Sequence, residues 1–200
     1  WTREGSKKEL WQVTGCTPAV VNGRLKRGVM ECYQKEIGRI HSEGIHLQEA
    51  NALTEVQERA LDEIQKQFLE KNVCLLHGVA SSGKTEIYIH LIQDSFAKGK
   101  QVLYLLPEIA ITTQITERLE KLFNGKMFVY HSKMTDNERV EIWNKMLHTS
   151  DSLLILGVRS SIFLPFHNLG LVVVDEEQET SFKQQDPAPR YHARDAAIVL

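Results

Sequence analysis

The sequence predicts an α/β fold in which helices cover both faces of a parallel β-sheet, preceded by a small helical element. Two observations predict it. From residue 46 onward, short apolar runs alternate with segments whose apolar residues recur at helical spacing, which is typical of a parallel sheet. A glycine-rich turn also joins one apolar run directly to a helical segment, an arrangement suited to binding anions at a helix start.

Composition limits the class of protein. Of the 200 residues, 42% are hydrophobic and 25% are charged, the fractions of a folded globular protein. No apolar run approaches the roughly 20 residues that a membrane-spanning helix needs, and the N-terminus lacks a signal-peptide pattern. The cysteines Cys16, Cys32 and Cys74 are too scattered for a metal knuckle or a disulfide framework. We therefore expect a cytoplasmic protein that does not contact membranes.

Two domains are expected, residues 1–45 and 46–200. The first carries eight Lys/Arg against five Asp/Glu, an excess that fits nucleic-acid binding and fits an ordinary solvated face equally well. The chain starts at Trp1 and stops at Leu200 inside an apolar stretch, which predicts a fragment whose second domain is truncated at its C-terminus.

Residues 1–45 predict a winged helix-turn-helix. A short helix is expected at 7–13. A second helix is expected to start at Pro18, because Thr17 can cap its first turn and proline needs no backbone N–H there. Strand-like residues 29–40 complete the order of helix, turn, helix and β-ribbon. An αα-hairpin with a β-tail is the alternative.

In residues 46–200, helices and strands are expected in alternation. Apolar residues at helical spacing predict helices at about 54–71, 85–97, 112–122 and 138–148. Short apolar runs predict strands at 73–77, 101–106, 127–130, 152–156 and 169–174. In the last helix, Ile142, Trp143 and Met146 are expected to face the sheet.

A phosphate-binding loop stands between the strand predicted at 73–77 and the next helix. It fits the pattern G-x-x-x-x-G-K-[ST] with Gly78, Val79, Ala80, Ser81, Ser82, Gly83, Lys84 and Thr85. Glycines let successive backbone N–H groups point at phosphate oxygens, and the helix dipole adds a favourable potential for anions. Lys84 is expected to reach the β- and γ-phosphates of ATP, and the Thr85 hydroxyl to ligate Mg²⁺.

The strand predicted at 169–174 ends in acidic residues, at the edge where parallel sheets bind ligands. Asp175 is expected to hold Mg²⁺ through its water shell, and Glu176 to orient and deprotonate the attacking water. A carboxylate directly after the metal-binding aspartate favours ATP hydrolysis over phosphoryl transfer to a small acceptor. An ATPase is therefore preferred to a small-molecule kinase.

Six blocks along residues 51–200 resemble superfamily 2 helicase motifs in the form found in the primosomal protein N′ (PriA) family. They are GVASSGKTEIY at 78–88, LPEIAITTQ at 106–114, HS at 131–132, GVRSSIFLPF at 157–166, NLGLVVVDEEQ at 168–178 and YHARD at 191–195. The resemblance implies a RecA-like P-loop NTPase lobe with a winged helix before it. It also implies the first lobe of an ATP-dependent 3′→5′ DNA helicase of replication restart.

The resemblance implies roles for two glutamines near the nucleotide. Gln57 is similar to the glutamine that reads adenine, and an exposed helix glutamine is the alternative. Gln178 stands where the family has histidine after the acids, so we expect a neutral hydrogen-bonding relay that still supports hydrolysis. Ala80-Ser81 and Glu179 also depart from the family, which has Thr-Gly and Asp at those positions.

The resemblance further implies which side chains meet DNA. The implied contacts are Pro107, Glu108, Thr112, Gln114, Arg159, Ser160, Phe182, Lys183, Tyr191 and Arg194. Hydroxyls and cations suit phosphate oxygens, and aromatic rings suit base stacking. The alternatives are an ion pair between Arg159 and a local carboxylate, and core packing of Phe182 and Tyr191.

Partners and limits also follow from the resemblance. Single-stranded and forked DNA are the expected substrates, and primosome and single-strand-binding proteins the expected partners. The zinc-binding cysteines of the family lie downstream, so no structural zinc is expected here. A second lobe is expected to supply the arginine that stabilises transition-state charge. A DNA-binding, ATP-dependent switch that does not translocate is the alternative function.

Overall fold

The computed structural model describes residues 20, 23, 27, 50–79, 82–123 and 125–200 of the chain. The chain divides into two units, Trp1–Gly38 and Arg39–Leu200. The predicted winged helix and its division from the rest at residue 45 lie outside the described residues, as do Ala80 and Ser81 of the phosphate loop. All elements given below belong to the second unit.

The structure confirms the four predicted helices of the second unit and adds shorter ones. They are α3 (Glu55–Gln67), α4 (Lys84–Ala97), α5 (Thr113–Phe123), α6 (Asp136–His148) and the short α7 (Ala193–Ala197), with 3₁₀ turns η1 (Glu108–Ala110), η2 (Arg159–Phe163) and η3 (Thr180–Phe182). Both α3 and α6 begin with a capping box, formed by Thr54 with Gln57 and by Thr135 with Glu138. In each pair the threonine side chain and the side chain three residues later satisfy two backbone N–H groups that the helix leaves free.

Four strands form one parallel sheet, as the alternation of elements predicts. They are β1 (Gln101–Leu105), β2 (Met127–Tyr130), β3 (Leu154–Gly157) and β4 (Leu169–Val174). The spatial order is β2-β3-β1-β4, and each neighbouring pair is parallel. The carboxyl ends of all four strands therefore lie along one edge of the sheet.

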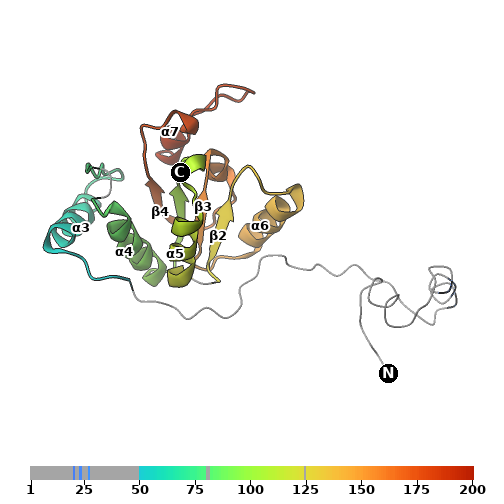
Figure 1. Ribbon diagram of the computed structural model, residues 1–200, viewed down its shortest axis with the longest axis horizontal. Helices are drawn as coiled ribbons and strands as arrows, with labels where there is room; N and C mark the ends of the chain where they lie inside the picture. The colour runs from blue at the N-terminus through green and yellow to red at the C-terminus, as the bar shows by residue number, and fades with distance from the viewer. Residues whose placement is uncertain (1–19, 21–22, 24–26, 28–49, 80–81, 124) are drawn as a thin grey trace. The chain divides into compact units, whose positions relative to one another are not determined.

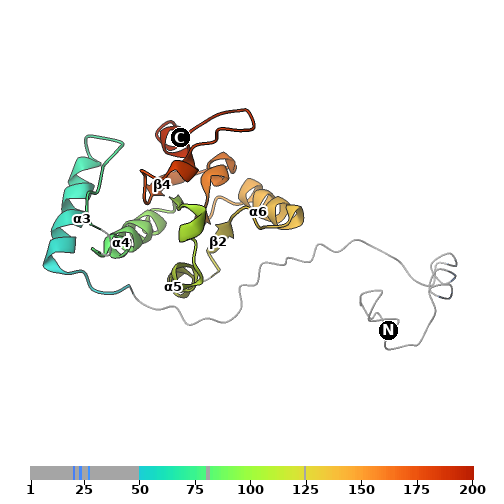
Figure 2. The same cartoon turned by 45° about the horizontal axis from the view of Figure 1, so that its top comes forward.

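Helices cover both faces of the sheet. On one face, Ile89 of α4 and Leu119 of α5 pack with Leu156 of β3, and all three are fully buried. On the other face, Met146 of α6 packs with Ile155 of β3, and both are fully buried. Figures 1 and 2 show α3 beside α4, away from α6. The predicted two-sided coverage is confirmed.

The prediction of a strand at 73–77 is wrong. Val73 and Leu75 are 52% and 73% exposed, whereas Leu76 packs against the buried residues around β4. The segment thus has the two-residue period of a strand, but its residues form no strand ladder. Cys74 and Leu76 pack, partly buried, against α3, α4 and β4, while Val73 and Leu75 face solvent.

The inward position predicted for Trp143 is also wrong, since this residue is 43% exposed. Ile142 and Met146 are 1% and 0% exposed. Residues four apart lie on the same face of a helix, and the next residue along is turned about 100° away. The buried face of α6 is therefore the one that Ile142 and Met146 share.

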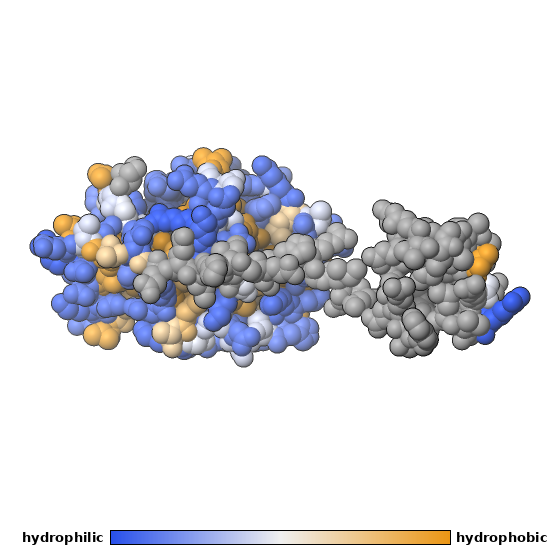
Figure 3. Space-filling model, turned by 60° about the horizontal axis from the view of Figure 1, so that its bottom comes forward, coloured by the Kyte–Doolittle hydropathy of each residue, from blue (hydrophilic) through white to orange (hydrophobic). Residues whose placement is uncertain are grey.

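Hydrophilic side chains cover most of the surface of the second unit on the side drawn in Figure 3, with smaller hydrophobic areas among them. The most exposed apolar residues include Leu69 and Ile109, each 85% exposed. Among the described helices, none is long and apolar enough to cross a membrane.

Candidate nucleotide-binding site

The phosphate loop leads directly into α4. Gly83 precedes the helix with a φ of 80°, a left-handed conformation that favours glycine. The Nζ of Lys84 donates to the carbonyls of Gly78 at 2.9 Å and Val79 at 3.4 Å. The ammonium group therefore lies against the start of the loop. Its N–H groups can exchange these carbonyl acceptors for the oxygens of a bound phosphate. Ser82 continues the turn, with its N–H donating to the Val79 carbonyl at 3.3 Å.

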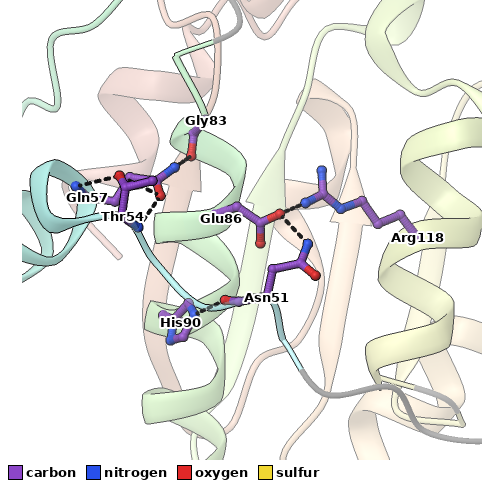
Figure 4. Close-up of polar contacts among 7 residues, drawn as sticks. All are labelled: Asn51, Thr54, Gln57, Gly83, Glu86, His90 and Arg118. Carbon is purple, nitrogen blue, oxygen red and sulfur yellow. Dashed lines mark hydrogen bonds and ion pairs between the residues drawn. The ribbon is translucent and has the colours of Figure 1, made fainter.

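Gln57 connects α3 to this loop. Its Oε1 accepts from the N–H of Thr54 at 2.9 Å, and its Nε2 donates to the carbonyl of Gly83 at 3.2 Å (Figure 4). The side chain is half-buried and is also the second member of the capping box of α3. The residue expected to read adenine thus lies at the junction of the loop and α4.

The segment before α3 is attached to the first turns of α4. Asn51 donates from Nδ2 to Oε1 of Glu86 at 2.9 Å, and its carbonyl oxygen lies 3.1 Å from Nε2 of His90 (Figure 4). Arg118 of α5 forms an ion pair with the same carboxylate oxygen of Glu86. Because Glu86 directly follows Thr85, these contacts hold the phosphate loop between α3 and α5.

Asp175 meets the phosphate loop at Tyr104. The Tyr104 hydroxyl donates to Oδ2 of Asp175 at 3.0 Å. The Thr85 side chain lies near the same phenol. Burial, together with the neighbouring carboxylate of Asp175, raises the pKa of Tyr104, so the phenol stays protonated and can donate. The structure therefore brings together Thr85 and Asp175, the two residues predicted to hold Mg²⁺.

Glu176 follows at the carboxyl end of β4 in an uncommon conformation. Its φ is 52°, the left-handed region that residues other than glycine rarely occupy and that is frequent at functional sites. Its N–H donates to Oδ1 of Asp175 at 3.1 Å, and its Oε2 accepts from Nε2 of Gln178 at 2.7 Å. The glutamine that replaces the family's histidine thus hydrogen-bonds the predicted catalytic carboxylate.

The oxygen donors at this edge fit a bound Mg²⁺. A hydroxyl from Thr85 and a carboxylate from Asp175 are hard ligands of the kind that Mg²⁺ prefers, with remaining positions left to water and phosphate. The two come from different elements, α4 and the end of β4, and both lie beside the one phenol.

The first block predicted to contact DNA lies at the carboxyl ends of β1 and β2. Pro107 is buried, whereas Thr112 and Gln114 are exposed at the start of α5. The carboxylate of Glu108 accepts a hydrogen bond from Ser132. An open depression of about 440 Å³ lies here, lined by residues that include Glu108, Thr112, Thr116, Glu120, His131 and Lys133.

Arg159 holds the loop that follows the acidic residues. Its Nη1 donates to the carbonyls of Ser181 at 3.4 Å and Lys183 at 3.0 Å. Its guanidinium carbon lies 6.0 Å from the ring centroid of Tyr191, and Phe163 packs edge-on against that ring with centroids 4.8 Å apart. In place of the ion pair with a carboxylate that was the alternative, the structure shows hydrogen bonds to carbonyls.

Three other predicted DNA contacts differ in how accessible they are. Ser160 is exposed. Arg194 forms ion pairs with Glu177 at 2.7 Å and with Asp195 at 3.0 Å. Phe182 is 1% exposed and packs in the core beneath β1, so it offers no ring face to a base. Phe182 therefore packs in the core, as the alternative had it, and the prediction that it stacks on a base is wrong.

Sequence reasoning missed Tyr104 and its neighbour Tyr88. Their rings pack edge-to-face with centroids 5.7 Å apart, and burial raises the pKa of Tyr88, as do the carboxylates of Asp175 and Glu176. The available signal was a single tyrosine among the valine and leucines of β1. A buried phenol needs a hydrogen-bond partner, and the acids after β4 were candidates for it.

The geometry above defines a P-loop NTPase lobe, in which a phosphate loop and an acidic strand end meet at one edge of a parallel sheet. Residues 54–197 match the DEAD/DEAH box helicase family, and the chain belongs to that family. Family membership implies ATP binding. The RecA-like fold predicted from the sequence is confirmed.

Relatives of known role are similar over most of the chain. The replication restart protein PriA of Bacillus subtilis is 37% identical over 194 residues, covering 95% of this chain and 24% of the relative. That of Rickettsia felis is 51% identical over 126 residues, covering 62% of this chain and 19% of the relative. The chain thus spans about a quarter or less of these relatives' length. Its resemblance to PriA is confirmed.

A solved structure shares the fold. It is a nuclease-deletion mutant of the Type ISP restriction-modification enzyme LlaGI, in complex with a DNA substrate mimic. The match has a TM-score of 0.53 at 16% identity, and it covers 66% of this chain and 16% of that one.

Proposed function

We propose that this chain is the ATP-binding lobe of a cytoplasmic, ATP-dependent DNA helicase that moves 3′→5′ and acts in replication restart, in primosome assembly at stalled forks. Membership in the helicase family and similarity to PriA support the proposal. The observation that carries it is the convergence of Thr85 and Asp175 at the Tyr104 hydroxyl. This convergence joins the phosphate loop and the acidic strand end into one site.

Each residue of this site has its own role in hydrolysis. Backbone N–H groups of the loop and the start of α4 bind phosphate oxygens, and Lys84 exchanges its carbonyl partners for the β- and γ-phosphates. Thr85, and Asp175 through water, would hold Mg²⁺, which would supply positive charge against the phosphates. Glu176 accepts a proton from the attacking water, and Gln178 orients its carboxylate.

Adenine recognition is proposed for Gln57. Its Nε2 and Oε1 lie at the exit of the phosphate loop and are held there by Gly83 and Thr54. An amide presents both a donor and an acceptor, which is the pattern that adenine requires and guanine does not match. We therefore expect ATP to be preferred to GTP.

DNA contact is proposed for the exposed residues Thr112, Gln114 and Ser160, and for Lys183 and Tyr191 on the loop that Arg159 holds. Hydroxyls and cations there suit the phosphates of a single strand, and Tyr191 offers a partly exposed ring. Single-stranded and forked DNA are the proposed substrates. Primosome and single-strand-binding proteins are proposed partners by similarity to PriA.

A strand-displacement assay on the natural full-length protein tests the proposal. With ATP, the wild-type protein should displace the strand of a forked duplex from a 3′ single-stranded tail, and Lys84→Ala should bind the DNA without displacing it. Unwinding by Lys84→Ala at the wild-type rate would refute the motor. Hydrolysis without displacement by the wild type would favour the ATP-dependent switch. Isolated, the 200-residue chain should turn over little, because the second lobe should supply the arginine.

A further inference from the structure

Tyr104 places the only hydroxyl of strand β1, whose sequence is QVLYL, at the end of the sheet where the acids lie. The side chain is 0% exposed. A phenol taken out of water loses its hydrogen bonds to solvent, which costs free energy unless the protein supplies a partner. Here the hydroxyl has that partner, because it donates to Oδ2 of Asp175 at 3.0 Å.

Both oxygens of Asp175 are held, each by a donor from a different part of the chain. The Tyr104 hydroxyl donates to Oδ2, and the N–H of Glu176 donates to Oδ1 at 3.1 Å. Two donors on two oxygens fix the rotation of the carboxylate about its Cβ–Cγ bond. The Thr85 side chain lies near the same phenol.

We propose that Tyr104 is a positioning residue for the metal–nucleotide complex, and that its hydroxyl holds the Asp175 carboxylate facing Thr85 before nucleotide binds. This inference rests on the proposed function, in which the phosphate loop binds ATP with Mg²⁺. Partners that orient a metal-binding carboxylate are typically worth about 10–100-fold in metal affinity. The hydroxyl therefore acts through Asp175 and does not touch the nucleotide.

Core packing alone accounts for the ring of Tyr104 but not for its hydroxyl. The ring packs with Tyr88 and with aliphatic residues of the same cluster, a role that phenylalanine fills equally well. Tyr104→Phe therefore removes one polar atom and leaves the packing in place. Tyr88→Phe is the matched control, since it removes a hydroxyl from the ring that contacts Tyr104, while the Asp175 hydrogen bond stays.

The test measures binding of a fluorescent ADP analogue to the natural full-length protein, once with Mg²⁺ and once with EDTA. Wild-type protein should bind more tightly with Mg²⁺. In Tyr104→Phe the affinity in EDTA should be unchanged and the gain from Mg²⁺ should fall by about tenfold or more. Tyr88→Phe should keep the full gain. Tyr104→Leu, which resembles the neighbouring strand residues, is a second variant and should show the same loss.

A double-mutant cycle with Asp175→Asn completes the test. If the hydroxyl acts through this carboxylate, Tyr104→Phe should have no further effect on the Mg²⁺ gain in the Asp175→Asn background. A full Mg²⁺ gain in Tyr104→Phe, or an equal loss in Tyr88→Phe, would overturn the role of Tyr104 and leave the proposed function standing. Wild-type protein that binds no nucleotide in either buffer would overturn both.

Discussion

Gly83 is where the phosphate loop becomes α4, and its replacement by alanine perturbs two features at once. Its φ of 80° is left-handed, where a Cβ costs about 1–2 kcal/mol. The new Cβ would also collide with Nε2 of Gln57, which would then lose its hydrogen bonds to Gly83 and Thr54, at about 1 kcal/mol each. We expect Gly83→Ala to lower the free energy of unfolding by roughly 3–4 kcal/mol.

A double-mutant cycle separates these two contributions. With Gln57→Ala already present the collision is gone, so Gly83→Ala should cost only the backbone part, about 1–2 kcal/mol. Gly99→Ala is the matched control, because Gly99 has a φ of 70° and an added Cβ there meets nothing within 4 Å. Gly99→Ala should lower the free energy of unfolding by about 1–2 kcal/mol, both in the wild type and in Gln57→Ala. Urea denaturation of the 200-residue chain, followed by circular dichroism, measures each free energy.

Additive losses would refute this reasoning. If the cost of Gly83→Ala is the same with and without Gln57, to within about 0.5 kcal/mol, the two residues are not coupled. The contact that joins α3 to the phosphate loop would then contribute nothing to the stability of the fold.

Three further predictions follow from burial and hydrogen bonding. Because the pKa of Tyr104 is raised in the folded chain, the free energy of unfolding should fall as the pH rises above about 10. Tyr104→Phe should make the slope of this fall shallower by about 1.4 kcal/mol per pH unit. Equal slopes for the wild type and Tyr104→Phe would contradict this prediction. In urea denaturation, Ile89→Ala should lower the free energy of unfolding by about 2–5 kcal/mol and Leu69→Ala by at most about 0.5 kcal/mol, because Ile89 is buried and Leu69 is exposed. Similar losses for the two variants would show that Ile89 does not lie in the core. Arg159→Ala should speed tryptic cleavage after Lys183 severalfold, because it frees that backbone, and an unchanged cleavage rate would show that Arg159 does not hold the loop.

Most of the fold of residues 50–200 was predictable, because local patterns and burial agree there. Apolar residues at helical spacing mark the four longer helices, and apolar runs mark the four paired strands. The segment at 73–77 was mispredicted because a short apolar run indicates burial and carries no information on backbone pairing. Trp143 was mispredicted because a large apolar residue next to the buried stripe of a helix need not lie within it.

The candidate site was predictable where chemistry follows from spacing along the chain. The phosphate loop and Asp175-Glu176 carry their own patterns, and the edge at which they meet follows from parallel strands. The structural roles of Tyr104 and Arg159 could not be predicted, because they depend on contacts between segments that are distant in the sequence. Tyr104 donates to a residue 71 positions away, and Arg159 to a backbone carbonyl 24 positions away. Such pairs are set by the register of β1 against β4 and by the path of a loop, which no local pattern encodes.

The most direct test of the central claim, that the phosphate loop and Asp175-Glu176 form one hydrolytic site, is the rate of ATP hydrolysis by Glu176→Gln. The natural full-length protein is measured with saturating single-stranded DNA, and nucleotide affinity is measured on the same preparation. Glutamine keeps the size of the side chain and removes the base, so affinity should be retained and hydrolysis should fall by about 10²–10⁴-fold. Hydrolysis by Glu176→Gln at the wild-type rate would contradict the claim.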